Sequence, residues 1–205
     1  MATFKSSTFG RISGKHGNAI AAVRKDGLCI LKEYNKPSNP NTPKQQAQRT
    51  IFQYGMKELN CLRCVFTITF DGQYGFNRAL SLAMKSSIVD EFPNFKLDYS
   101  MLLISNGNLE KLALLKIERQ IATAIRLEWN TEELMGVSTH DRVNLVILDP
   151  AKKSVVFKQN CAIRSTGSIE VELPPIWKGL PIHGWVYLSS SVGKTFSISQ
   201  YIGLI

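Results

Sequence analysis

Residues 36–60 read K-P-S-N-P-N-T-P-K-Q-Q-A-Q-R-T-I-F-Q-Y-G-M-K-E-L-N, and the rest of the chain is organised around this stretch. Pro37 and Pro40 keep regular structure out of its first part. Thr42 stands where a helix N-cap belongs, and Pro43 occupies the first helical position, where a missing N–H costs nothing. Apolar and polar residues then recur at helical spacing on opposite sides, which predicts an amphipathic helix of about five turns. The apolar side holds Ala47, Ile51, Tyr54, Gly55, Leu59 and Leu62, with Phe52 and Met56 at its edge, and the polar side holds Gln46, Arg49, Gln53, Lys57 and Asn60.

The sequence before this helix predicts an extended, mobile arm and a β-hairpin. Residues 1–17 carry three glycines among basic residues, a composition typical of an arm. Residues 18–24 and 28–34 are short runs on either side of Lys25-Asp26-Gly27. Asp-Gly between such runs indicates a hairpin, in a type I′ turn with positive φ at both central positions.

The sequence after the helix predicts further helix and then strands. Residues 61–74 are ambiguous, residues 76–88 fit a second helix, and residues 97–104 fit a strand. From about residue 109, short alternating runs separated by turns indicate an antiparallel immunoglobulin- or fibronectin-like β-sandwich. We therefore expect a mainly β protein, α+β overall, divided into an arm, hairpin and helical region at residues 1–108 and a sandwich domain at residues 109–205.

The charge of the chain is concentrated near its start. The net charge is +9; residues 1–60 contain ten Lys and Arg against three Asp and Glu, whereas residues 61–205 contain fifteen against thirteen. This asymmetry is typical of a segment that meets a negative partner, although a solvated basic surface fits equally well. The candidate contact residues are Lys5, Arg11, Lys15, Arg24, Lys25, Arg49 and Lys57.

The start of the chain has no apolar core of signal-peptide length, and no apolar run is long enough for a membrane span. We therefore expect synthesis in the cytoplasm and no membrane partner. A place within a particle or virion is compatible with this expectation. Four cysteines in 205 residues form no disulfide framework.

No motif in the sequence predicts catalysis, a cofactor or a metal. Cys61 and Cys64 form a C-x-x-C that follows a helix and has no second pair, so structural cysteines are the better interpretation. Gly193-Lys194-Thr195 lacks the first glycine of a P-loop and fits a hairpin turn. The three histidines are isolated, and no G-x-S-x-G is present. Trp129, Trp177 and Trp185 fit the core of a sandwich better than a ligand-stacking platform.

Several motifs resemble a family of bacterial proteins of about 200 residues with no assigned function. They are G-K-x-G-N at residues 14–18, N-P-x-T at 39–42, Q-x-x-Q-R-x-x-F at 45–52, Trp129-Asn130, an acidic strand start at Asp141, L-P-x-x-W-x-G at 173–179 and a serine-bearing end at 197–203. Arg24 departs from the pattern, where tryptophan is commoner. The resemblance implies membership of the fold and transfers no functional residue. A less specific likeness links the Gly-Lys arm and the Gln/Arg helix to small phage-type particle proteins.

These observations favour a non-enzymatic structural or assembly protein, such as a subunit of a phage-like or other multi-subunit particle. Its partners would be copies of itself or neighbouring subunits. The alternative is a nucleic-acid-binding protein that uses the basic N-terminal segment.

Overall fold

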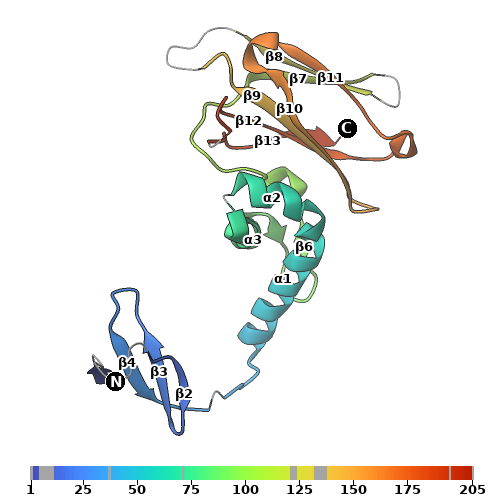
Figure 1. Cartoon of the computed structure of the whole chain (residues 1–205). Coiled ribbons are helices and arrows are strands. Elements are labelled where there is room, and N and C mark those ends of the chain that lie inside the picture. The colour runs from blue at the N-terminus through green and yellow to red at the C-terminus, as the bar shows by residue number, and fades with distance from the viewer. Residues whose placement is uncertain are drawn as a thin grey trace. The chain divides into compact units, whose positions relative to one another are not determined.

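The computed structural model describes residues 2–4, 12–36, 38–70, 72–120, 124–131, 138–193 and 195–204 (Figure 1). They belong to two compact units, Met1–Thr42 and Pro43–Ile205. The second unit starts at the predicted helix start. The expected domain boundary between residues 108 and 109 stays a prediction. Within the described residues, no helix is long and apolar enough to cross a membrane.

The Met1–Thr42 unit is a four-stranded antiparallel sheet. Its strands are β1 (Ala2–Phe4), β4 (Cys29–Glu33), β3 (Ala19–Val23) and β2 (Gly14–His16), in that spatial order. Residues 2–4 and 14–16, which the sequence analysis places in the arm, are therefore edge strands of a sheet.

The predicted hairpin between β3 and β4 is confirmed, but its turn differs from the prediction. Gly27 has a φ of +82°, whereas Asp26 is not among the residues with positive φ that a type I′ turn requires. The N–H of Arg24 donates to the carbonyl of Leu28 at 2.9 Å, and this bond encloses residues 25–27. The loop is thus one residue longer than expected, with the left-handed conformation confined to the glycine.

Three helices and short 3₁₀ turns open the second unit: α1 (Pro43–Leu59), η1 (Asn60–Leu62), α2 (Arg63–Thr69), η2 (Gly72–Tyr74) and α3 (Gly75–Ser86). The predicted start of α1 at Pro43 is confirmed, and Gly55 and Leu59 of its predicted apolar side are buried. Helix α3 begins one residue earlier than predicted and ends before Ile88, and its predicted apolar side is buried at Phe76, Leu80 and Ala83. The ambiguous stretch is helical, because Val65 and Phe66 both face the core and the Thr69 hydroxyl donates to the carbonyl of Ile104 at 2.6 Å.

The strand predicted at residues 97–104 is wrong. Only β5 (Ile88–Val89) and β6 (Lys96–Leu97) pair here, and the 3₁₀ turn η3 (Tyr99–Met101) follows. Asp98 ends the strand because its Oδ1 accepts hydrogen bonds from the Ser100 backbone N–H at 2.9 Å and the Ser100 hydroxyl at 2.6 Å. This local capping outweighs the apolar composition of the segment.

The predicted antiparallel sandwich is confirmed. A four-stranded sheet has the order β10-β9-β12-β13, and a three-stranded sheet has the order β11-β8-β7. The fourth strand of the sandwich, β10, pairs with the third, β9, whereas in a constant-type immunoglobulin domain the fourth strand lies beside the fifth. The bounds are β7 (Ala113–Gln120), β8 (Ala124–Asn130), β9 (Arg142–Asp149), β10 (Ser154–Ile163), β11 (Ser168–Glu172), β12 (His183–Ser189) and β13 (Gln200–Leu204), with 3₁₀ turns η5 (Arg164–Thr166) and η6 (Pro175–Trp177).

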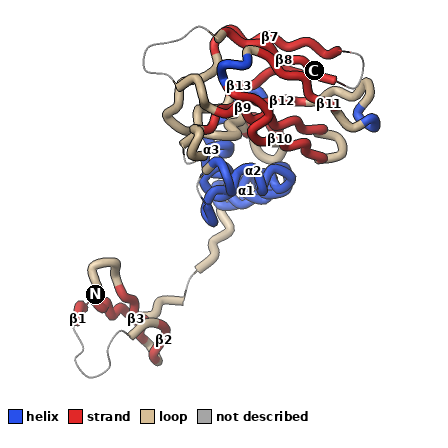
Figure 2. Tube along the Cα trace, turned by 45° about the horizontal axis from the view of Figure 1, so that its top comes forward, coloured by secondary structure: helices blue, strands red, loops and turns tan. Residues whose placement is uncertain are grey.

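The unit has three layers: the helices, the four-stranded sheet and the three-stranded sheet (Figure 2). Strands β9 and β12 are buried on both faces. Val146 and Trp185 pack against the helices, whereas Leu145 and Val186 face the other sheet. Burial on both sides explains why β9 reads as a nearly continuous apolar run.

Candidate functional site

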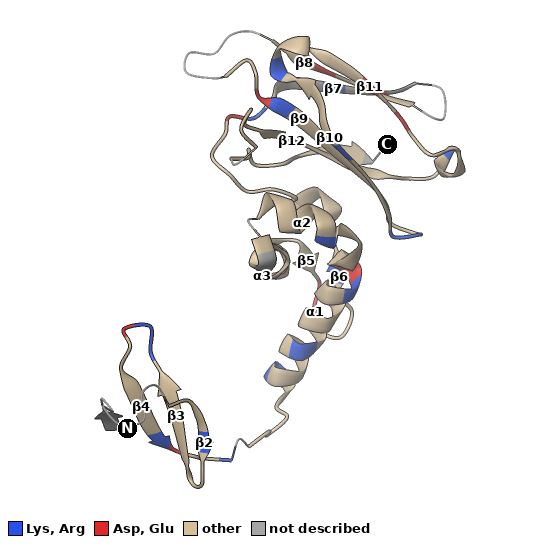
Figure 3. Cartoon of the chain, viewed as in Figure 1, with Lys and Arg blue, Asp and Glu red and all other residues tan. Residues whose placement is uncertain are grey.

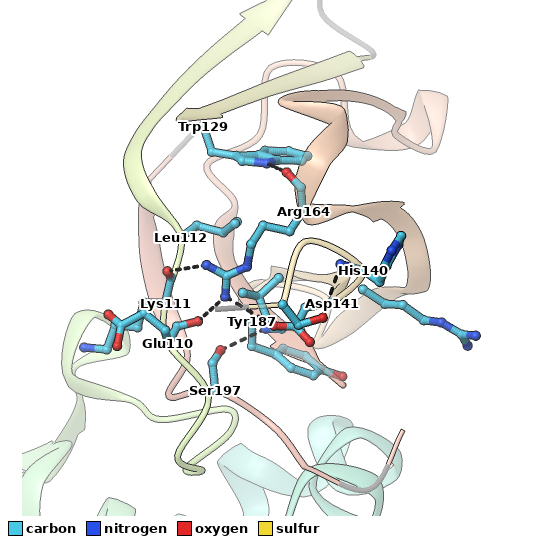
Figure 4. A network of polar contacts seen from close by, with 12 residues as sticks. Glu110, Lys111, Leu112, Trp129, His140, Asp141, Arg164, Tyr187 and Ser197 are labelled. Carbon is cyan, nitrogen blue, oxygen red and sulfur yellow. Dashed lines mark hydrogen bonds and ion pairs between the residues drawn. The ribbon is translucent and has the colours of Figure 1, made fainter. Parts of the chain in front are cut away.

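One buried polar network of the sandwich is centred on the guanidinium of Arg164, at the start of η5 (Figure 4). Its Nη1 donates to the carbonyl of Lys111 at 3.2 Å, and its Nη2 donates to the carbonyl of Glu110. The same Nη2 lies 3.5 Å from a carboxylate oxygen of Asp141. The indole N–H of Trp129 donates to the backbone carbonyl of Arg164 at 2.6 Å. One side chain therefore joins the segment before β7 to the starts of β9 and η5.

The chemistry of this network is architectural. Burial raises the pKa of the Asp141 carboxyl, and the Arg164 guanidinium opposes that rise. Burial likewise lowers the pKa of Arg164. Two of the guanidinium's hydrogen bonds end on main-chain carbonyls, so these donors are occupied by the fold itself. We infer that the network joins the segments that it bonds, because removing one partner of a buried ion pair leaves the other charge uncompensated.

A second cluster lies where η3 meets the four-stranded sheet. The Tyr99 ring stacks on the imidazole of His183 with 4.1 Å between centroids. The Nδ1 of His183 lies 2.7 Å from the hydroxyl of Tyr201. Burial lowers the pKa of His183, while the nearby Asp98 opposes that shift. Burial also raises the pKa of Tyr99 to about 12, so the tyrosine is neutral at ordinary pH. The cluster connects the helical layer to the sheet.

The tryptophan and cysteine candidates of the sequence differ in burial. Trp129, Trp177 and Trp185 are 6%, 1% and 0% exposed, which confirms their assignment to the core. Cys61 is half-buried and its thiol donates to the carbonyl of Glu58 at 3.4 Å, whereas Cys64 is exposed. Burial raises the pKa of Cys61, the opposite of what redox chemistry requires. Among the described residues, no three His, Cys, Asp or Glu side chains gather as a metal site would require.

Two of the predicted basic contact residues lie outside the described residues, and the other five lie on the N-terminal sheet and on α1. Lys5 and Arg11 lie outside the described residues. Lys15 is exposed on β2, with its Nζ 3.9 Å from the centroid of the Tyr34 ring. Arg24 forms an exposed ion pair with Asp26 at 3.4 Å in the hairpin turn. Lys25 is exposed in the same turn, and Arg49 and Lys57 are exposed on α1 (Figure 3).

The helical layer carries an excess of exposed positive charge. Glu58 is half-buried and pairs with Lys153 at 2.8 Å, so it does not offset that charge at the surface. Acidic residues are otherwise absent from the described part of the segment 43–86. The exposed basic residues of this segment are Lys44, Arg49, Lys57, Arg63, Arg78 and Lys85.

Helices α1 and α3 form a groove that sequence reasoning did not identify. The two helices approach closely at Gly55, where an added Cβ would lie 2.6 Å from a methyl group of Leu80. Beside this contact lies a groove of about 570 Å³. Its lining combines the apolar residues Ile51, Phe52, Leu80 and Met84 with the polar residues Gln48, Asn77, Ser81 and Lys85. Phe52 is 47% exposed. The spacing of residues along one helix shows which of them lie on its apolar side. Which of these residues line a groove depends on where the second helix packs.

A larger hollow of about 1020 Å³ lies between the turn that joins α2 to α3 and the loops of the sandwich. Its lining includes Ile68, Arg78, Asn106, Thr195 and Phe196. Arg78 is already engaged, because its Nη1 donates to the carbonyl of Phe70 at 3.1 Å. The other polar residues named here, Asn106 and Thr195, contribute a neutral amide and a neutral hydroxyl.

Comparison with known proteins agrees with the motifs of the sequence. The model of a family of unknown function, DUF6266, matches residues 11–203. No curated protein matches the chain.

Proposed function

Since the chain belongs to DUF6266, a family without an assigned function, we propose a function from the structure itself: a non-enzymatic structural or assembly protein. In this proposal the surface of α1 and α3 binds neighbouring protein subunits. The setting that we propose is a phage-like or other multi-subunit particle.

The incomplete burial of α1 carries this proposal. Of its seventeen residues, only Gly55 and Leu59 are buried. Helices of this length are marginal in water, and most of their stability in proteins comes from packing of an apolar face. Phe52 nevertheless remains 47% exposed beside an apolar groove. A partner that covers the groove would supply the packing that the first turns of α1 lack.

The ionisable groups in the two polar clusters of the sandwich are held in place by contacts within the fold, which supports a binding role for the protein. Arg164 and Asp141 are occupied by the fold, and His183 is held between Tyr99 and Tyr201. These groups are engaged in packing and main-chain contacts, which suits a scaffold that presents a surface to a partner.

Light scattering after size-exclusion chromatography tests the proposal. We expect the wild-type protein to show a mass above the 23.0 kDa of one chain, rising along a concentration series. Phe52→Ser should lower that mass, because it removes the exposed ring beside the groove. Ile176→Ser is the matched control, since Ile176 is 67% exposed in η6, away from α1 and α3. A wild-type protein that stays at the monomer mass throughout would contradict self-assembly.

Nucleic-acid binding is a second candidate, favoured by one face of the N-terminal sheet. Lys15 pairs with Ile20 on β3, and Ile20 pairs with Lys32 on β4, so the two lysines lie in one row across three strands. Tyr34 adds an aromatic ring beside Lys15. If this face binds phosphates, a mobility shift should weaken steeply with salt, and Lys15→Glu with Lys32→Glu should remove it. A shift that is absent at low salt would eliminate this candidate.

A further inference from the structure

We propose that this protein forms a two-fold dimer in which the loop of residues 89–95 of each copy inserts into the groove between α1 and α3 of the other. This inference rests on the proposed assembly function and names the partner as a second copy of the chain.

The inserted element is the loop that joins β5 to β6. Ile88 is buried and its methyl group packs near Gly55, so the next residue, Val89, points outward, as strand alternation requires. Val89 is 41% exposed and Phe92 is 45% exposed. These are two large, partly exposed apolar side chains on one short loop, and we assign them as the apolar contacts that the loop offers to a partner.

The loop is braced from behind by α1. The ring of Phe95 is half-buried and lies 6.4 Å from the ring of Tyr54 on α1. Phe92 in turn lies 6.4 Å from Phe95. The backbone N–H of Asn94 donates to the carbonyl of Glu91 at 2.9 Å and closes the turn. A loop held in this way loses little conformational freedom on binding.

The receiving groove has an apolar part. Ile51, Leu80 and Met84 belong to its lining, together with the exposed ring of Phe52. A protruding aromatic side chain such as Phe92 suits a groove of about 570 Å³ with this lining.

The charges on the two elements are opposite. Asp90 and Glu91 separate Val89 from Phe92. Lys85 lies on the rim of the groove, is exposed, and forms no ion pair with another described residue. Glu91 is likewise exposed and forms no ion pair within the described part of the chain. Asp90 pairs with Lys96 of β6 in the same chain at 3.3 Å, an exposed contact that contributes little. Glu91 and Lys85 are therefore the pair that we assign across the interface.

The position of the two elements in the chain favours two-fold symmetry. Helix α3 ends at Ser86 and β5 begins at Ile88, so the rim of the groove leads directly into the loop. A two-fold axis that places one loop in one groove places the second loop in the second groove as well. Each copy then contributes both parts of the contact, and the dimer is closed.

Sedimentation equilibrium of the full chain with reversed charges tests this arrangement. Lys85→Glu and Glu91→Lys should each weaken the dimer about tenfold, because each change creates two like-charge contacts per dimer. The double variant K85E/E91K, and an equimolar mixture of the two single variants, should both restore association. Phe92→Ser should weaken the dimer about a hundredfold, as expected for loss of an aromatic anchor on each side.

The controls and contrary outcomes separate this inference from the proposed function. Lys178→Glu and Ile176→Ser change exposed residues outside the loop and groove, and they should leave the dimer unchanged. Charge reversals that leave a wild-type dimer intact, or a double variant that does not recover, would overturn the loop-in-groove contact. The assembly function would then stand on the Phe52→Ser result.

Two further results would overturn the dimer itself. If species larger than two chains form and Phe92→Ser abolishes all of them together with the dimer, the loop-in-groove contact is not closed, and the two-fold arrangement is ruled out. A chain that stays monomeric, yet binds an added acidic amphipathic peptide in the groove, would assign the groove to a different protein.

Discussion

Replacing Leu59 with alanine tests how the helical layer is held against the sandwich. Leu59 is 0% exposed at the end of α1, in a cluster that includes Phe66 of α2 and Trp185 of β12. Leucine-to-alanine changes in cores cost about 2–5 kcal/mol, and the larger values belong to sites that cannot collapse around the cavity. Helix α2 and a sheet strand both contribute to this cluster, so we expect about 3–5 kcal/mol. For a protein of this size, the melting temperature should fall by about 6–20 °C.

Tryptophan fluorescence is the appropriate assay, because all three tryptophans belong to the Pro43–Ile205 unit. Urea unfolding should show a lower midpoint with an unchanged m value. Phe52→Ala is the matched control on the same helix; at 47% exposure its side chain adds little to the core, and we expect a cost of less than about 1 kcal/mol. A Leu59→Ala protein that is as stable as wild type, or less affected than Phe52→Ala, would refute the assignment of the buried side of α1.

Three other changes probe separate parts of the second unit. Gly107→Ala would place a Cβ 2.1 Å from the carbonyl oxygen of Phe196, so we expect a loss of about 1–3 kcal/mol in urea unfolding, and an unchanged midpoint would contradict that close approach. Burial lowers the pKa of His183 in the folded state, so stability is complete above its ordinary pKa and decreases as the pH falls through about 6.5. His183→Phe should therefore flatten the fall in melting temperature between about pH 7 and 5, and an equally steep fall would show that other groups cause it. Arg164→Leu leaves the carboxylate of Asp141 buried without its partner and should cost about 3–5 kcal/mol, whereas a neutral result would show that the network contributes no stability.

Local patterns in the sequence determined the elements that have one buried side. The start of α1 follows from Pro43 and from the recurrence of apolar residues up to Leu59, both of which act over a few residues. The hairpin between β3 and β4 follows from Gly27, whose positive φ costs a glycine little. The alternation of Ile125 and Leu127 in β8 likewise predicted a strand with one side facing the core.

Tertiary contacts decided the elements whose composition fits more than one structure. Residues 65–69 are helical because the neighbouring sheet accepts an apolar helix face, and that surface exists only once β9 and β12 have paired. The partner of Asp141 is Arg164, which follows an intervening hairpin and is brought beside it by strand pairing.

The candidate site depends on the tertiary structure for the same reason. Gly55 allows α1 and α3 to approach, and this approach creates the groove next to Phe52. The sequence around Phe92 does not show whether its ring is buried or exposed. Other parts of the chain decide that, because they either cover the ring or leave it in solvent. Exposure is a property of what the rest of the chain leaves uncovered, so only the folded unit identifies this surface.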